Sequence, residues 1–332
     1  MDSFQGPTVS IIIPVYNGGE KFRRCLSSVA ACTPPPEEVI VVADGDTDGS
    51  WRVAEEYGTQ VLRMPTPGGP ARARNLGAGE AKGDILFFVD ADVTIPQDAI
   101  SQVAGAFQDD SELSAIFGSY DDAPFETNFL SQYKNLFHHY VHQGAKEDAS
   151  TFWAACGAIR RGVFSAMGGF DEAYRRPSIE DIELGYRFRR AGHKIRLLKG
   201  LKVKHLKRWG IVSLLRADFF YRALPWTDLI LRESEFIDDL NVTISNRVSV
   251  IFTYVFCLAL LGSWCMPWLL PVALLAMIGL LVIHWDFYRF FKDKHGWAFA
   301  AKTIPWHWFY FFYGGLAFGI GSAKFHFERL RS

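Results

Sequence analysis

Residues 85–92 read Ile-Leu-Phe-Phe-Val-Asp-Ala-Asp, five apolar residues followed by two acids with one residue between them. A short apolar run that ends in polar residues is typical of a strand buried on both faces of a sheet. Asp90 and Asp92 would then lie at the carboxyl end of this strand, where ligands bind in open α/β sheets. Two carboxylates there can share one Mg²⁺ or Mn²⁺ ion, which prefers oxygen ligands and leaves coordination positions for substrate phosphates. An Asp-x-Asp triplet is common in loops, so its place after a buried strand is what predicts the metal site.

Two similar apolar runs precede this strand, at residues 9–13 and 39–42, and segments with helical spacing separate the three. Strands that alternate with helices imply a parallel sheet with right-handed crossovers. Asn17, Asp44 and Asp92 each follow one of these strands, so we expect them at the same edge of the sheet. The predicted fold is therefore α/β, a Rossmann-like and mostly parallel sheet with flanking helices.

The bulk composition excludes several classes of protein. The formal net charge is −1, whereas proteins that bind nucleic acid usually carry a basic excess, so we expect no nucleic-acid partner. None of the five cysteines forms a Cys-x-x-Cys pair, which favours a reducing compartment over a disulfide framework. Residues 1–10 lack the basic and apolar regions of a signal peptide, so we expect the first domain to be cytoplasmic.

The C-terminal part of the chain predicts a membrane region. No charged residue occurs from Val248 to Ile283, which is longer than the roughly 20 residues that one crossing needs. The sequence Trp-Cys-Met-Pro at 264–267 offers a turn, so we predict two short helices. The stretch 286–302 holds four Lys or Arg residues and should stay cytoplasmic. Residues 304–323 form either a third crossing or a re-entrant or interfacial segment. We expect a multi-pass protein of the cell membrane.

Between these two parts, residues 185–217 contain eleven Lys or Arg residues and no Asp or Glu. This stretch is either a solvated basic face or a surface that meets diphosphate or anionic lipid. Residues 210–232 mix aromatic residues with arginines, which suits a helix in the membrane interface, broken near Pro225, or a helix packed on a core. We predict three segments: a cytoplasmic catalytic domain at 1–209, amphipathic interfacial helices at 210–247 and a transmembrane region of two to three helices at 248–332.

Three further segments carry polar groups suited to chemistry. The loop at 44–50 follows the second strand, and its first acid can reach a nucleotide base. The segment 68–77 combines glycines, which let the backbone approach a ligand closely, with two arginines that can bind phosphate oxygens. The alternative is a surface helix with ordinary arginines. Glu180 and Asp181 are either ordinary acids of a first helical turn or the general base for an acceptor hydroxyl.

Taken together, these segments resemble family 2 glycosyltransferases of the GT-A fold over roughly residues 8–210. Motifs of that family occur here in the family's order and near its spacing: SIIIPVYN at 10–17, VVADGDTDGS at 41–50, GGPARARNLG at 68–77, FFVDADV at 87–93, then residues 157–161, 168–171 and 180–181. The resemblance implies an inverting transfer of a sugar from a UDP- or GDP-linked donor, with Mg²⁺ or Mn²⁺ as cofactor.

The resemblance also implies roles for single residues. The donor would be held by Pro14, Tyr16 and Asp44 at the base, by Asn17 beside them, by Arg74 at the base or diphosphate and by Asp90 at the ribose. Asp92 would bind the metal ion and Asp181 would be the catalytic base. Gly157 and Glu180 are candidates for the acceptor side.

The sequence departs from the family pattern at two places. Ala43 stands where family members commonly have the first of two acids. Residues 205–209 read His-Leu-Lys-Arg-Trp, whereas processive members have Gln-x-x-Arg-Trp, which leaves polymer synthesis open. Arg208 and Trp209 remain donor-binding candidates, and His205 becomes a candidate ligand for the metal or the diphosphate.

We therefore expect transfer of a sugar to a hydroxyl or phosphate of a membrane lipid or lipid-linked acceptor at the bilayer. One alternative is a glycosyltransferase of polysaccharide synthesis that uses a soluble or growing-chain acceptor. A second is a membrane protein that binds nucleotide sugars without turnover. A nucleotidyltransferase would share the sheet and the metal carboxylates but would need no acceptor base at Asp181.

Overall fold

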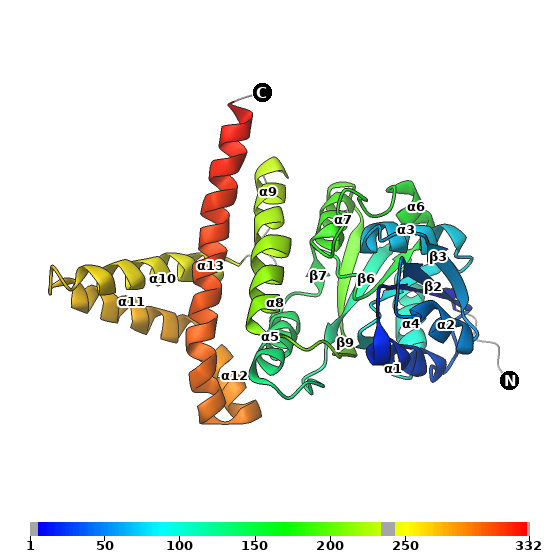
Figure 1. Cartoon of the computed structure of the whole chain (residues 1–332), viewed down its shortest axis with the longest axis horizontal. Coiled ribbons are helices and arrows are strands. Elements are labelled where there is room, and N and C mark those ends of the chain that lie inside the picture. The colour runs from blue at the N-terminus through cyan, green and yellow to red at the C-terminus, as the bar shows by residue number, and fades with distance from the viewer. Residues whose placement is uncertain (1–5, 234–242, 331–332) are drawn as a thin grey trace. The chain divides into compact units, whose positions relative to one another are not determined.

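The computed structural model describes residues 6–233 and 243–330 (Figure 1). The chain divides into two compact units, Met1–Gly210 and Ile211–Ser332, which are described separately. Two predictions fall partly outside the described residues. These are the interfacial segment at 210–247 and the N-terminal stretch 1–10, in which we expect no signal peptide.

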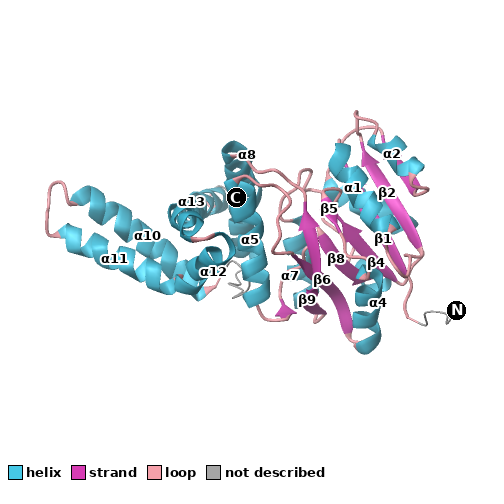
Figure 2. Cartoon of the chain, turned by 90° about the horizontal axis from the view of Figure 1, so that it is seen from below, coloured by secondary structure: helices cyan, strands magenta, loops and turns pink. Residues whose placement is uncertain are grey.

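The first unit is built on a nine-stranded sheet with the order β3-β2-β1-β4-β8-β6-β9-β5, and β7 pairs with β9 (Figure 2). The strands are β1 Val9–Val15, β2 Glu38–Asp44, β3 Gln60–Met64, β4 Ile85–Val89, β5 Val93–Thr94, β6 Leu113–Tyr120, β7 Asp148–Ala149, β8 Cys156–Arg160 and β9 Lys194–His205. The first four strands are parallel, as predicted. β8 runs antiparallel between β4 and β6, so the sheet is mixed beyond β4.

Helices cover both faces of this sheet because the side chains of each strand alternate between two cores. The helices are α1 Gly19–Ala30, α2 Ser50–Glu56, α3 Pro70–Glu80, α4 Ala99–Asp109, α5 Phe129–Gly144, α6 Arg161–Ala166 and α7 Glu180–Arg190. Ile11 and Ile13 pack in one core with side chains of α1 and α4. Ile12, between them, packs in the other core with side chains of α3 and α7. Burial of alternate faces fixes the register of β1 and therefore the positions of the loops that follow it.

The first strand extends beyond the apolar run at residues 9–13 and includes Pro14. β1 continues to Val15, and Pro14 lies opposite Val42 of β2. The pairing of β1 with β4 stops at Ile12, before Pro14 is reached. Proline is tolerated in a sheet where its missing N–H costs no ladder bond, so the end of the β4 pairing gives it a place.

The second unit is helical: α8 Ile211–Leu215, the π-helix η1 Arg216–Ala223, α9 Leu224–Glu233, α10 Ile244–Gly262, α11 Leu269–Ile283, α12 Trp285–His295 and α13 Trp297–Arg329. The predicted break near Pro225 is wrong, because the helix changes type there instead. The N–H of Leu224 donates to the carbonyl of Phe219, five residues back. Proline lacks the N–H of a normal helical bond, and a π-helical turn is one way to accommodate such a residue.

α10 and α11 form an apolar hairpin, as the uncharged stretch predicted (Figure 1). Among the described residues, α10 is long and apolar enough to cross a membrane. α11 and α12 together would form a second membrane span only if they cross as a single segment, because a bend of 63° separates the two helices. The possible third crossing at 304–323 lies within α13, which does not meet the same criterion.

Candidate active site

The carboxyl ends of β1, β2 and β4 meet at one edge of the sheet, and the first acid there is already engaged by the backbone. The carboxylate of Asp44 accepts hydrogen bonds from the N–H groups of Gly68 (2.6 Å) and Gly69 (2.9 Å). Gly69 has φ +93°, and a Cβ at this position would lie 2.5 Å from the carbonyl oxygen of Arg175. Asp44 is buried, so it holds the glycine loop in place beside the predicted base site.

Asn17 and Tyr16 follow β1 and behave differently. Asn17 has φ +50°, and its side-chain oxygen accepts from the N–H groups of Thr47 (2.8 Å) and Asp48 (3.3 Å). Asn17 thus ties the loop after β1 to the loop after β2. Tyr16, the residue after the end of β1, is 56 % exposed, whereas Pro14 within β1 is half-buried. This arrangement leaves Tyr16 accessible to a planar ligand.

Asp92 lies beside His205. The Nε2 of His205 is 3.5 Å from the Oδ2 of Asp92, and Val93, the next residue, pairs with His205 between β5 and β9. Burial alone would raise the pKa of Asp92, but His205, Lys207 and Lys21 outweigh burial and lower this pKa to about 2. Asp92 is therefore an anion at any physiological pH.

These two side chains fit a divalent metal ion that also contacts the substrate. A carboxylate and an imidazole can both be ligands of Mn²⁺ and similar divalent metal ions. In nucleotide-binding sites such an ion is usually held by one or two protein groups together with substrate phosphates and water. Within residues 6–233 and 243–330, no group of three or more His, Cys, Asp or Glu side chains is placed to form a closed site. The donor set therefore fits an open site better than an all-protein cage.

Two aromatic residues around His205 were not predicted from the sequence. The ring of Tyr120 stacks on the imidazole at 4.7 Å between centroids and 9° between planes. The indole of Trp153 packs edge-on against Tyr120 at 4.7 Å. Tyr120 is the last residue of β6, and Trp153 lies shortly before β8. Neither strand was predicted from the sequence, so neither aromatic residue could be placed near His205. These contacts fix the plane of the imidazole next to Asp92.

Arg74 and two acids form a buried network. The Nη2 of Arg74 is 2.7 Å from the Oδ1 of Asp90, and its Nη1 is 2.9 Å from the Oε1 of Glu180. Only about 5 % of the side chain is exposed for Arg74 and for Glu180. The two terminal nitrogens that were expected to bind the base or diphosphate are thus occupied by carboxylates. The network joins α3, the end of β4 and the start of α7.

Asp181 lies next to this network. The N–H of Ala154 donates to its Oδ2 (3.1 Å), and the N–H of Asp90 donates to the carbonyl of Ala155 (3.2 Å). The segment before β8 therefore connects the end of β4 at Asp90 with Asp181. Burial, and then the neighbouring charge of Glu180, raise the pKa of Asp181 to about 7, against the opposing effects of Arg74 and two backbone N–H groups. A carboxylate of this kind can accept a proton near neutral pH.

The remaining candidates differ in exposure. Gly157 is buried in β8, where a Cβ would lie 2.4 Å from the ring of Phe152, so this close packing needs a glycine. Trp209 is buried, and its backbone N–H donates to the hydroxyl of Ser131 (2.7 Å). The side chain of Arg208 is 69 % exposed and makes a long contact of 3.4 Å with Glu126. Of these candidates, Arg208 is placed to meet a soluble ligand.

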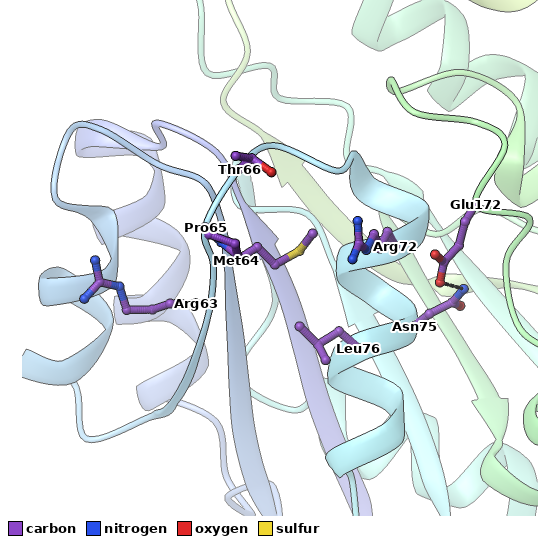
Figure 3. A pocket seen from close by; sticks show the side chains of 8 residues that line it. All are labelled: Arg63, Met64, Pro65, Thr66, Arg72, Asn75, Leu76 and Glu172. Atoms are coloured by element: carbon purple, nitrogen blue, oxygen red, sulfur yellow. Dashed lines mark hydrogen bonds between the residues drawn. The ribbon is translucent and has the colours of Figure 1, made fainter.

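A depression of about 510 Å³ lies away from these acids, between the end of β3 and the outer side of α3 (Figure 3). Arg63 and Met64 line it on one side, and Arg72 and Leu76 on the other. The strand-end carboxylates do not belong to its lining, so it is separate from the site described above.

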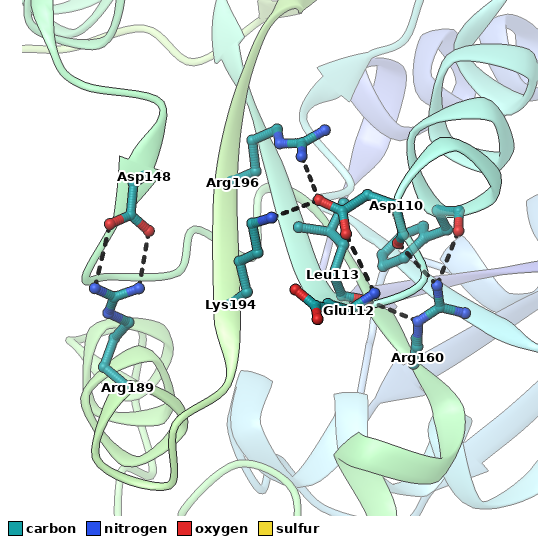
Figure 4. A network of polar contacts seen from close by, with 9 residues as sticks. Asp110, Glu112, Leu113, Asp148, Arg160, Arg189, Lys194 and Arg196 are labelled. Carbon is teal, nitrogen blue, oxygen red and sulfur yellow. Dashed lines mark hydrogen bonds and ion pairs between the residues drawn. The ribbon is translucent and has the colours of Figure 1, made fainter.

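Three basic residues of the stretch 185–217 are paired with acids inside the first unit (Figure 4). Lys194 and Arg196 both contact the Oδ2 of Asp110, at 2.6 and 2.5 Å, and Arg189 pairs with Asp148. These pairs lie where β6 and β9 begin, at the opposite end of the strands from Tyr120 and His205. Ion pairing therefore accounts for part of the basic excess without any external partner.

Comparisons with known proteins agree with this geometry. The family model described as glycosyl transferase family 2 matches residues 10–168, which contain the predicted strand-end motifs. This chain carries a glycosyltransferase family 2 domain. The family 2 domain includes Asp44, Arg74, Asp90 and Asp92, whereas Asp181 and His205 follow the matched residues.

The relatives are similar over short segments. Glycosyltransferase GlyG of Streptococcus pneumoniae is 29 % identical over 117 residues, 34 % of this chain and 38 % of GlyG. Glycosyltransferase AglE of Haloferax volcanii is 39 % identical over 93 residues, 26 % of this chain and 31 % of AglE. The matched region thus spans only about a third of the length of these relatives.

A solved structure extends the likeness of the fold beyond the family 2 domain. The mannosyltransferase PcManGT of Pyrobaculum calidifontis, solved with GDP-Man and Mn²⁺, aligns with a TM-score of 0.60 over 95 % of this chain and 88 % of its own. The two sequences are 16 % identical, so the likeness establishes a GT-A fold with flanking helices and nothing further.

Proposed function

We propose that this chain is a glycosyltransferase that moves a sugar from a nucleotide sugar, UDP- or GDP-linked, to a membrane lipid or lipid-linked acceptor. The observation that carries the proposal is one site with two carboxylates in opposite environments. Asp92 lies 3.5 Å from the imidazole of His205, with two lysines nearby, and its pKa is lowered. Asp181 follows the buried acid Glu180 and accepts from the N–H of Ala154 at 3.1 Å, and its pKa is raised. Pairs of titratable groups with pKa values pushed apart are typical of sites that use one group as an anion and the other as a base.

The donor would lie along the carboxyl ends of β1, β2 and β4. Tyr16 would stack on the base, the loop held by Asp44 would border it, and Asp90 would accept from the ribose hydroxyls. Asp92 and His205 would hold the Mg²⁺ or Mn²⁺ ion, which stabilises negative charge on the diphosphate when it is bound. PcManGT was solved with GDP-Man and Mn²⁺, which supports a donor and an ion of these classes.

The chemical step would be a single displacement. Asp181 takes the proton from the acceptor hydroxyl as that oxygen forms a bond to the anomeric carbon of the sugar. The bond between this carbon and the donor's phosphate oxygen breaks at the same time, and the nucleoside diphosphate leaves with the electron pair. Attack from the face opposite the leaving group inverts the anomeric configuration, and no covalent sugar–enzyme intermediate forms.

The lipid acceptor is proposed from the second unit. The α10–α11 hairpin exposes large apolar side chains, among them Leu261 (74 %), Trp264 (94 %) and Val282 (69 %). Soluble proteins rarely expose contiguous apolar surface of this kind, and a bilayer is an occupant with matching chemistry. At 1.5 Å per residue α10 is about 28 Å long, close to the thickness of about 30 Å of a hydrocarbon core. We propose a protein of the cell membrane with its catalytic unit at the cytoplasmic surface.

The function is tested with the full-length protein in detergent. It is incubated with Mn²⁺, membrane lipid extract and a panel of radiolabelled UDP- and GDP-sugars, and the organic phase and the free nucleotide are both measured. We expect one donor to give labelled lipid and an equal amount of nucleoside diphosphate. Label that appears only on added oligosaccharide would refute the lipid acceptor, and donor binding without turnover of any donor would favour a binding protein.

The membrane placement is tested with native cysteines. Cys265, next to Trp264 at the hairpin tip, is exposed, whereas Cys25, Cys32 and Cys156 are buried. A maleimide that cannot cross membranes should label Cys265 in intact cells, and Cys265→Ser should remove that label. Labelling of Cys265 only after the membrane is permeabilised would show that the tip does not reach the far side.

A further inference from the structure

Glu180 is an acid with no route to a soluble or lipid acceptor. One of its carboxylate oxygens is paired with Arg74, and the other accepts from the N–H of Ser178 at 2.9 Å. The residue is 4 % exposed and buried where α7 begins. The adjacent Asp181 is half-buried instead, so it is the acid of this pair that is exposed enough to meet a substrate.

Arg74 is equally enclosed. It is 4 % exposed, and it reaches Glu180 across 106 residues of sequence and Asp90 across 16. A buried ion is costly unless it is paired and hydrogen-bonded, and removing one partner leaves an uncompensated charge. The guanidinium binds one carboxylate through each terminal nitrogen, a fixed planar geometry that a lysine would not reproduce. The ion pairs therefore tie the position of α7 to the position of Asp90.

We infer that Arg74 and Glu180 are positioning residues that connect the donor carboxylate Asp90 to the catalytic base Asp181. In this arrangement Arg74 does not bind the base or diphosphate directly, and Glu180 does not touch the acceptor. Their contacts with each other hold the start of α7, and Glu180 acts on Asp181 through its charge. The inference rests on the proposed function, because it assigns roles relative to the proposed donor and base.

The electrostatic surroundings of Asp181 support this reading. The charged groups that act on it are Glu180 on its own helix and Arg74 on α3, and the N–H groups of Ala154 and Ile182 donate to its oxygens. Burial is the largest contribution that raises the pKa of Asp181, and the charge of Glu180 is the next. Removing the charge of Glu180 should therefore lower the pKa of Asp181, and the released guanidinium of Arg74 should act in the same direction.

The test is the pH dependence of kcat for Glu180→Gln in the full-length protein, with the donor that supports turnover in the panel above and saturating Mn²⁺. Asp181 must be deprotonated to accept a proton, so the rate falls as the pH drops through its pKa. In the variant this fall should occur at a pH lower by roughly one unit, because a like charge has been removed. The KM for the donor should change little, since Glu180 does not contact it.

Two further variants complete the test. Glu180→Asp keeps the negative charge, so its kcat should fall at about the same pH as in the wild-type protein. This variant can be measured even if Glu180→Gln does not fold. Glu183→Gln is the matched control, because Glu183 lies in the same helical turn but pairs with Arg187 at 2.6 Å. It should leave the pH of the fall unchanged.

The possible failures are distinguishable. If the wild-type protein turns over no nucleotide sugar, the proposed function fails. If the wild-type protein is active, two results refute only the positioning role. One is a wild-type pH dependence of kcat in Glu180→Gln. The other is a shift of the pH dependence in Glu180→Asp as large as the one expected for Glu180→Gln. A large rise in the donor KM of Glu180→Gln with an unchanged pH dependence would place Glu180 in the donor site.

Discussion

Asp92 and Asp181 are the same residue type in the same site, yet their surroundings differ in sign. The neighbours of Asp92 are His205, Lys207 and Lys21, and its pKa falls to about 2. The strongest charged neighbour of Asp181 is Glu180, and burial together with that charge raises its pKa to about 7. The role of a carboxylate is therefore set by what the fold places beside it. The surroundings of Asp92 stabilise an anion, whereas those of Asp181 favour a group that can take up a proton.

Removal of the charge at Asp92 should have the largest effect. Asp92→Asn replaces a hard anionic ligand with a neutral amide, so we expect transfer to fall below detection while the thermal unfolding midpoint stays near that of wild type. Activity is measured across a titration of Mn²⁺. Asp98→Asn, at an exposed acid before α4, is the control and should behave as wild type. Full activity of the wild-type protein in the presence of EDTA would contradict the assignment of Asp92 as a metal ligand.

Asp181→Asn should have the next largest effect and a different signature. Asparagine still accepts from the N–H of Ala154 but cannot take a proton, so kcat should fall roughly a hundredfold or more, as for loss of a general base. The donor Kd, measured by calorimetry with the nucleotide sugar and Mn²⁺, should stay within a few-fold of wild type. A collapse of donor affinity would instead move Asp181 to the donor side.

His205 should show a smaller effect, confined to the metal side. His205→Ala removes a candidate ligand and a neighbour that stabilises the anionic Asp92, so the Mn²⁺ concentration for half-maximal activity should rise roughly 10–100-fold. Activity at saturating Mn²⁺ should largely recover. His193→Ala is a matched control, because His193 contacts Ser114 at the other end of β9. An unchanged Mn²⁺ midpoint in His205→Ala would remove His205 from the metal site.

The sequence predicted β1, β2 and β4 because each is a short apolar run followed by polar residues. β8 escaped prediction because it is five residues long, contains Gly157 and runs antiparallel between β4 and β6, of which only β4 was predicted. Pro225 was misread as a helix break because the sequence does not show that the backbone can use five-residue spacing there.

For the site, the strand-end acids were predictable from position alone, since the ends of parallel strands meet at one edge. The contacts of Arg74 were not, because its partner Glu180 lies 106 residues away and no local pattern links them. The stack of Tyr120 on His205 was missed for the same reason, as it joins the ends of β6 and β9. Residue types and motifs identified the candidates, and only the tertiary contacts separated those that face a ligand from those that hold others in place.

The most direct test of the two-sided site is the pH dependence of kcat for the wild-type protein, measured from pH 5 to 9 with saturating donor, acceptor and Mn²⁺. Asp92 is ionised throughout this range, so protonation of Asp181 alone should cause kcat to fall at acidic pH. The account predicts that kcat rises with pH and levels off, with one apparent pKa near 7 that belongs to Asp181. A rate that is flat from pH 5 upward would contradict the assignment of Asp181 as the general base.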